Sequence, residues 1–311
     1  MLNNKNNLMG LMLYCIFNQA QAEVLVILPE SGPMARAGLS VKQGFMSAYQ
    51  ASGQKTPIKF VNSDKKQIAH LLKINVNKKT QMVIGPLARN EVEGLIRTKP
   101  KVRVLALNEV TDQADNVWQF SLSKKDDAYA LNQVLQKDKI KQLYVFRQPG
   151  AEVDSELFLM SLVSQMDYPL TFVEEVPKKL NKKSSLLLLG NNQWINSLDK
   201  LPNKNVYVLA NAIEQQQPIP KGVKFCDAPA LYDLAWPDVI RAYQQNPVSM
   251  PYQRLLAFGG DAWHIAQQYL DEPNLKSIEF QGRTGLIQIS DNHIQRIPHC
   301  FESTQKGIKT L

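Results

Sequence analysis

Residues 24–45, VLVILPESGPMARAGLSVKQGF, decide the fold of this chain. The five apolar residues at 24–28 predict a strand that is buried on both faces, as in a parallel sheet covered by helices. Pro29 and the turn Ser31-Gly32-Pro33 end this strand, and an amphipathic helical pattern follows. Because ligands of such folds gather at the carboxyl ends of the strands, we expect the Ser31-Gly32-Pro33 loop to border a cleft.

The alternation of strand and helix patterns continues to about residue 210. Apolar runs predict further strands, and helical patterns lie between most of them, at 58–61, 82–84, 102–107, 143–146, 170–173, 186–189 and 206–209. The series pauses at Trp118-Gln119-Phe120 and then starts again. This pattern predicts an α/β fold of two lobes, each a doubly wound parallel sheet with right-handed crossovers.

The last part of the chain contains two helical patterns, at 232–243 and 252–269. Gly259-Gly260 lies within the second pattern and indicates either a close-packing point or a break in the helix. The alternating residues 285–297 predict a hairpin that turns at Asp291-Asn292. We expect lobe 1 to comprise 23–120 and about 231–275, and lobe 2 with the hinge to comprise 121–230 and about 276–311.

Residues 1–22 have the pattern of an export signal. Lys5 precedes an apolar run at 8–17, and Ala20-Gln21-Ala22 is a small-x-small cleavage site, so we expect cleavage after Ala22. Cys15 follows the bulky Leu13-Tyr14 rather than small residues, which disfavours a lipid anchor in the outer membrane. No other window approaches the roughly 18 apolar residues of a membrane helix, so we expect no transmembrane segment in the mature chain.

The composition is that of a globular protein with a basic surface. The 311 residues carry a formal net charge of +8, which favours an acidic partner such as an anionic cell-wall polymer or a membrane surface. Four lysines are concentrated in a polar segment that we interpret as a solvated loop: Lys178, Lys179, Lys182 and Lys183. No aromatic residues are interleaved with them, which argues against nucleic-acid binding.

Cys226 and Cys300 are the two cysteines of the mature chain. An exported compartment permits a disulfide between them, which would require the C-terminal segment to return to the strand near Phe225. The alternative is that both are small buried hydrophobic residues.

The search for catalytic chemistry yields motifs without the required order. Three motifs resemble elements of penicillin-recognising serine enzymes: Ser121-Leu-Ser-Lys124 resembles S-x-x-K, Ser290-Asp291-Asn292 resembles S-D-N, and Arg283-Thr284-Gly285 resembles K-T-G. In this chain the S-D-N element follows the K-T-G element, whereas in those enzymes it precedes it. Ser123 is better explained as a helix N-cap. The four histidines show no metal-ligand spacing, and no phosphate-cradling glycine loop is present. We therefore expect no catalytic residues, no metal site and no cofactor.

Seven landmarks together resemble the C-terminal domain of the LppC/LpoA-type penicillin-binding-protein activators. They occur in order between about residues 24 and 307: LPESGPMARAGLSVKQGF, VIGPLARNEVEGL, VLALNEV, WQFSLSKKDDA, GVKFCDAP, RLLAFGGDAWHIA and FQGRTGLIQISDNHIQRIPHCFESTQKG. The resemblance implies a bilobal fold of the type 1 periplasmic binding proteins. It also implies a non-enzymatic role in the periplasm, namely binding a class A penicillin-binding protein and stimulating peptidoglycan synthesis.

The alternative is a periplasmic solute-binding protein of a transport system. Type 1 binders of amino acids place hydroxyl residues after the second cleft strand, whereas this chain has Gly85-Pro86-Leu87-Ala88-Arg89 there and Asn108-Glu109 after the next strand. These residues argue against an amino-acid ligand. Ser31, Arg89 and Asn108 remain able to bind another ligand, such as a peptidoglycan fragment or muropeptide.

Overall fold

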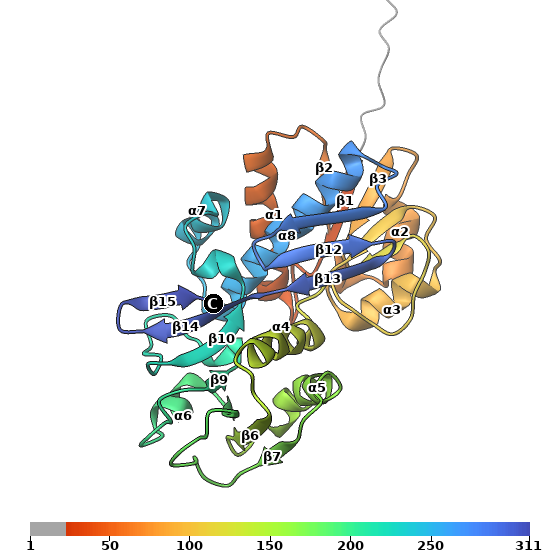
Figure 1. Ribbon diagram of the computed structural model, residues 1–311. Coiled ribbons are helices and arrows are strands. Elements are labelled where there is room, and N and C mark those ends of the chain that lie inside the picture. Colours follow the sequence, from red (N-terminus) through yellow and green to blue (C-terminus); the bar gives the residue numbers. More distant parts are fainter. Residues whose placement is uncertain (1–22) are drawn as a thin grey trace, which may run out of the picture.

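The computed structural model describes residues 23–311, and the predicted export signal lies outside the described residues. The chain forms two α/β lobes connected by several crossing segments, as Figure 1 shows. Lobe 1 contains a parallel sheet of five strands in the order β2-β1-β3-β4-β5. Its strands are β1 (Glu23–Leu28), β2 (Ile58–Asn62), β3 (Thr80–Ile84), β4 (Arg103–Ala106) and β5 (Val117–Gln119).

Strand β1 is buried on both faces, as its unbroken apolar run predicts. Val24, Val26 and Leu28 face one apolar core, and Leu25 and Ile27 face another, because successive side chains of a strand point to opposite sides. Helices α1 (Ala35–Ser52) and α8 (Met250–Asp271) contribute to the first core, and α2 (Ile68–Asn75) and α3 (Arg89–Arg97) contribute to the second. Helix α7 (Pro237–Gln245) packs against α1 and α8.

Lobe 2 contains a mixed sheet of seven strands in the order β15-β14-β10-β9-β8-β6-β7. Five are parallel, namely β6 (Gln142–Arg147), β7 (Leu170–Phe172), β8 (Ser184–Leu189), β9 (Val206–Val208) and β10 (Val223–Asp227). The antiparallel β14 (His299–Thr304) and β15 (Gly307–Thr310) complete it. Helices α4 (Lys124–Lys137) and α5 (Glu152–Val163) cover one face, and the short α6 (Asn192–Asn196) lies on the other. Three short 3₁₀ turns are η1 (Ser63–Lys65), η2 (Ala210–Ala212) and η3 (Pro229–Leu231).

A third sheet forms from the late segment with alternating residues. It consists of β11 (Ser277–Gln281), β12 (Leu286–Ser290) and β13 (His293–Ile297), all antiparallel. Ser290 pairs with His293, so the hairpin turns at Asp291-Asn292, as predicted. Its inward residues Ile287, Ile289 and Ile294 join the first core of lobe 1. The packing therefore divides the segment from about 276 to 311, which the sequence assigns to lobe 2: β11–β13 pack on lobe 1, and β14–β15 extend the sheet of lobe 2.

Helices α1 and α8 approach closely because glycines lie at their contact. A Cβ on Gly44 would lie 1.9 Å from the carbonyl oxygen of Leu256, and one on Gly259 would lie 2.0 Å from that of Val41. Gly259 and Gly260 are therefore close-packing residues within an unbroken helix, and the alternative of a helix break does not apply. Trp263, one turn further along α8, is 1% exposed and is a core residue.

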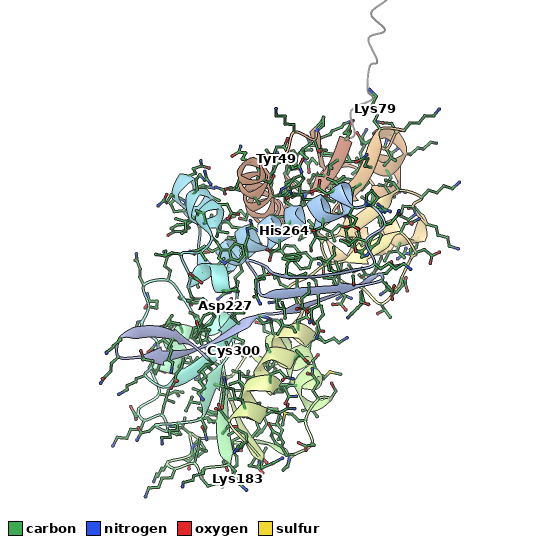
Figure 2. All side chains as sticks on the ribbon, turned by 45° about the horizontal axis from the view of Figure 1, so that its top comes forward. Tyr49, Lys79, Lys183, Asp227, His264 and Cys300 are labelled. Atoms are coloured by element: carbon green, nitrogen blue, oxygen red, sulfur yellow. A yellow bond between two sulfur atoms is a disulfide. The ribbon has the colours of Figure 1, made fainter. Side chains whose placement is uncertain are left out.

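Cys226 of β10 and Cys300 of β14 lie directly opposite each other in an antiparallel pair. A disulfide joins them in this structure, and Figure 2 labels Cys300. The return of the C-terminal segment to the strand containing Phe225 creates this pairing. Within residues 23–311, none of the helices combines the length and the apolar character that crossing a bilayer requires.

Candidate functional site

A cavity of about 610 Å³ lies between the two lobes. Lobe 1 contributes the start of α1, the segments after β3 and β4, and the first turns of α8. The crossing segment before α4 and the outer side of α5 supply the remaining walls. About half of the lining residues are apolar, among them Met34, Leu87, Leu107, Leu122, Leu157, Leu255 and Phe258, and the others are polar or charged, among them Arg89, Glu109, Lys124 and Lys125. The arrangement suits a ligand or segment that combines apolar with polar groups.

The Ser31-Gly32-Pro33 loop lies at the carboxyl end of β1, but these three residues are not among those that line the cavity. The Ser31 hydroxyl donates a hydrogen bond to the Asp64 carboxylate at 2.8 Å and accepts one from the Asn62 amide at 2.9 Å. Gly32 has φ +74°, and a Cβ there would lie 2.3 Å from an Asp64 carboxylate oxygen. The loop is thus fastened to the turn after β2, and the following Met34 lines the cavity in its place.

The second predicted loop contributes two of its residues. Leu87 and Arg89 line the cavity. Gly85 and Pro86 lie behind them, where the Gly85 N–H donates to the Leu105 carbonyl and the Pro86 carbonyl accepts from the Leu107 N–H. A Cβ on Gly85 would lie 2.0 Å from the Ile27 carbonyl oxygen, so this glycine permits the strands to approach.

Asn108 also lines the cavity, but its side chain is already engaged. Its amide nitrogen donates to the Leu87 carbonyl at 2.9 Å, and its side-chain oxygen accepts from the Glu109 N–H at 2.9 Å. The Ser121 hydroxyl donates to the Glu109 carboxylate at 3.4 Å, and the Ser123 hydroxyl caps α4 by accepting from the Asp126 N–H at 3.1 Å. The chain itself therefore uses several of the polar groups that a small polar ligand would need.

Several cavity residues were not predicted from the sequence. Leu255 and Phe258 come from α8, and Leu157 comes from α5, both remote in sequence from the strand ends. Ser121, Ser123 and Lys124 follow the carboxyl end of β5, and this position was the signal that could have assigned them to the cleft.

Two buried ionic contacts connect the lobes at the hinge. The Arg254 guanidinium of α8 donates to both carboxylate oxygens of Asp227 at the end of β10, at 2.8 and 2.7 Å, and to the Ala210 carbonyl at 2.6 Å. The Tyr232 hydroxyl donates to the same carboxylate at 2.7 Å. Burial and this carboxylate raise the pKa of Tyr232, so the hydroxyl stays protonated. Figure 2 places Asp227 at the level where the lobes meet.

The second contact joins β13 to the start of α4. Arg296 donates to the Asp127 carboxylate at 2.5 Å and to the Thr284 carbonyl at 3.3 Å. Its neighbour Asp126 is 8% exposed, and burial raises the pKa of this carboxyl to about 6 despite the opposing effect of Arg296. The hinge thus contains a carboxyl group with a pKa of about 6.

Two of the elements that resemble those of serine acyl enzymes make side-chain contacts within the chain. The Thr284 hydroxyl donates to the fully buried Asp261 at 2.7 Å, and the Asn292 amide donates to the Asp115 carbonyl on lobe 1. These contacts hold both elements in structural roles. Across residues 23–311, no group of three or more His, Cys, Asp or Glu side chains is placed to hold a metal ion.

The two α/β lobes and the cleft between them have the fold of the type 1 periplasmic binding proteins. The C-domain of LpoA from Haemophilus influenzae, described as a regulator of PBP1A, superposes with a TM-score of 0.75 at 16% identity, over 93% of this chain and 100% of that domain. A protein from Chromobacterium violaceum described as "a putative branched-chain amino acid ABC transporter" has a TM-score of 0.74 at 21% identity, over 90% of this chain and 99% of that one.

Comparison of sequences shows which proteins with this fold the chain resembles. The family model described as "LppC putative lipoprotein" matches residues 7–152. The penicillin-binding protein activators LpoA of Haemophilus ducreyi and Glaesserella parasuis are each 24% identical over 89% of this chain. The resemblance to LppC/LpoA-type proteins is thereby confirmed. The chain spans about half the length of these relatives, 53% and 52%.

Proposed function

We propose that this chain binds a class A bifunctional penicillin-binding protein in the periplasm and stimulates its peptidoglycan transpeptidation without catalysing a reaction itself. The observation that carries the proposal is the sequence match to penicillin-binding protein activators over 89% of the chain. The match to a domain described as a regulator of PBP1A, which this chain covers completely, supports it.

The cleft supports an interaction role over amino-acid binding. Leu87 and Arg89 stand where binders of amino acids place hydroxyl groups, and the Asn108 amide is bonded to the Leu87 carbonyl. The remaining polar side chains of the segment before α4 bond within the chain. A free amino acid would therefore find few unengaged hydroxyl or amide groups, although Arg89, Lys124 and Lys125 of the lining carry charges that suit its carboxylate.

The hinge supports the same proposal. In a flytrap that closes on a solute, the lobes must move relative to each other. Here Arg254 and Asp227 make a two-point contact between them, with side chains 13% and 2% exposed. Charged, buried contacts of this geometry resist separation because each partner would lose its compensating charge. We propose that the two lobes act as one rigid scaffold. The same proposal includes the division of the chain into the two lobes and its export by residues 1–22.

The test uses purified chain and a purified class A synthase from the same organism. Binding is measured by biolayer interferometry, and transpeptidation is measured as the fraction of cross-linked peptides in the product. We expect saturable binding and an increase in cross-linking at constant synthase concentration. Absence of both binding and stimulation would rule out the activator function.

Solute binding is the second candidate, because the cavity of about 610 Å³ has the size of a small-molecule site. A thermal-shift screen with amino acids and muropeptides tests it. A ligand at 100 times its dissociation constant adds roughly 2.7 kcal/mol to the free energy of unfolding, which gives a visible shift. Unchanged melting curves across the screen would reject this candidate, whereas a shift with muropeptides alone would make the cleft a sensor of cell-wall fragments.

A further inference from the structure

Helix α5 has an apolar stripe on the face that points away from its own lobe. Val153, Leu157 and Met160 are spaced at i, i+4 and i+7, so they share one face of the helix. Their exposed fractions are 88%, 58% and 62%. The buried side of the helix, with Ser155, Phe158, Leu159 and Leu162, lies opposite. A helix that is apolar on both sides is typical of an element covered on both sides.

The stripe has a defined size and setting. It extends over about 10 Å of helix, at 1.5 Å per residue. Leu157 also lines the interlobe cavity, and a groove of about 520 Å³ runs between α4 and α5, with Tyr129, Gln133 and Ser164 in its walls. Ser161 lines both hollows, so they adjoin along one flank of α5. The stripe is therefore a ridge beside a groove, which is surface relief that a second helix packs against. Figure 1 shows α5 beside α4 on the outside of lobe 2.

Carboxylates flank the apolar stripe, and their charge indicates which kind of surface would cover it. Glu152 and Glu156 lie on one side of it, Asp154 lies on the other, and all three are exposed. Glu156 also pairs with Arg147 of this chain at 3.5 Å, whereas no ion pair joins Glu152 or Asp154 to another of the described residues. This acidic turn belongs to a chain whose formal net charge is +8. Complementarity therefore favours basic side chains next to the apolar groups that cover the stripe.

A second copy of this chain satisfies the requirement poorly. Two α5 helices packed in parallel would bring the same carboxylates together, which is unfavourable. Packed antiparallel, the acidic turn of each helix would face the uncharged residues 161–164 of the other. Neither arrangement supplies a cation.

We infer that α5 is the docking surface for an amphipathic helix of the partner protein, with Lys or Arg on both sides of its apolar stripe. This inference rests on the proposed function for the identity of the partner, a class A penicillin-binding protein. The apolar contacts supply the affinity, and the flanking carboxylates set orientation and association rate.

The first experiment compares two triple variants in binding to the purified synthase. The α5 variant removes the stripe by Val153→Gln, Leu157→Gln and Met160→Gln, and glutamine preserves helix propensity. The control variant removes three other apolar side chains, which are 53%, 85% and 41% exposed, by Ile74→Gln, Leu234→Gln and Ile308→Gln. We expect the α5 variant to bind about tenfold or more weakly, and the control variant to bind within about twofold of wild type. Unchanged melting temperatures show that both variants are folded.

The second experiment reverses charge. One triple variant carries Glu152→Lys, Asp154→Lys and Glu156→Lys, and it should associate with the synthase more slowly and with a weaker dependence on salt. The control variant carries Asp199→Lys, Glu214→Lys and Glu272→Lys, and its association rate and salt dependence should change less. A photo-crosslinking residue at position 160 should then capture a basic amphipathic helix of the synthase.

The outcomes separate the two proposals. If wild type binds the synthase and the α5 variant binds equally well, the docking surface is wrong and the activator function stands. If wild type neither binds nor stimulates, the activator function fails and the partner assigned to α5 fails with it. Crosslinks between two copies of this chain, with a dimer in light scattering that the α5 variant loses, would overturn the inference in favour of self-association.

Discussion

Arg254 and Asp227 join the two lobes through a two-point ion pair, with guanidinium nitrogens 2.8 and 2.7 Å from the two carboxylate oxygens. Arg254 belongs to the long helix that packs on lobe 1, and Asp227 ends a central strand of lobe 2. The Tyr232 hydroxyl donates to the same carboxylate, so both oxygens have partners. The contact lies at the point where the chain crosses between the lobes.

Replacing Arg254 by methionine should destabilise the protein by about 3 kcal/mol, because it leaves the buried Asp227 carboxylate without a cation. Urea unfolding measures the change. Arg97→Met is the matched control, since Arg97 and Glu93 form an ion pair whose side chains are 70% and 40% exposed. The control should change the free energy of unfolding by at most about 0.5 kcal/mol. Equal effects of the two variants would contradict a structural role for the hinge contact.

The alternating α/β fold could be predicted because its strands are buried on both faces. Residues such as Val24 to Leu28 form unbroken apolar runs, and this pattern is visible without tertiary information. The lobe against which β11–β13 pack could not be predicted in this way. The alternation of Ile287, Gln288 and Ile289 shows that one face of the hairpin is buried, but not which lobe covers it.

The candidate site was predicted less completely than the fold. Leu87, Arg89 and Asn108 line the cavity because each closely follows a parallel strand. Ser31 occupies an equivalent position, yet its hydroxyl is bonded to Asp64, a residue 33 positions away that no local pattern connects to it. Long-range polar contacts of this kind depend on side-chain geometry, which hydrophobic periodicity does not encode.

Gly259→Ala should destabilise the protein by about 2 kcal/mol or more. The new methyl group would lie 2.0 Å from the Val41 carbonyl oxygen, so α1 and α8 would have to separate. Gly94→Ala is the control, because its Cβ would meet only a side-chain methyl of Ile68 at 3.0 Å. We expect that variant to change the free energy of unfolding by at most about 1 kcal/mol, because the gain in helix propensity offsets the small shift that Ile68 must make. A neutral result for Gly259→Ala would show that the two helices can repack.

Removing the disulfide with Cys226→Ala and Cys300→Ala should lower the free energy of unfolding by about 2–4 kcal/mol. The crosslink spans 74 positions in sequence and therefore restricts the unfolded chain strongly. Thiol labelling of protein that has been unfolded without reductant provides the direct measurement, and mass spectrometry should find neither cysteine modified. Modification of both cysteines would mean that the bond does not form in the protein.

Asp126 should make stability depend on pH in the direction opposite to that of a salt-bridged carboxylate. Its pKa in the folded protein, about 6, lies above the ordinary value of 3.8, because burial disfavours the charged form. Between about pH 4 and 6 the folded state therefore binds more protons than the unfolded state, and the contribution of this group to stability falls as pH rises. Two pKa units correspond to at most about 3 kcal/mol.

Asp126→Asn should gain stability relative to wild type as pH rises from 4.5 to about 7.5, as measured by urea unfolding. Parallel curves of stability against pH for the two proteins would show that this carboxyl is ionised in the fold throughout that range, with Arg296 outweighing its burial.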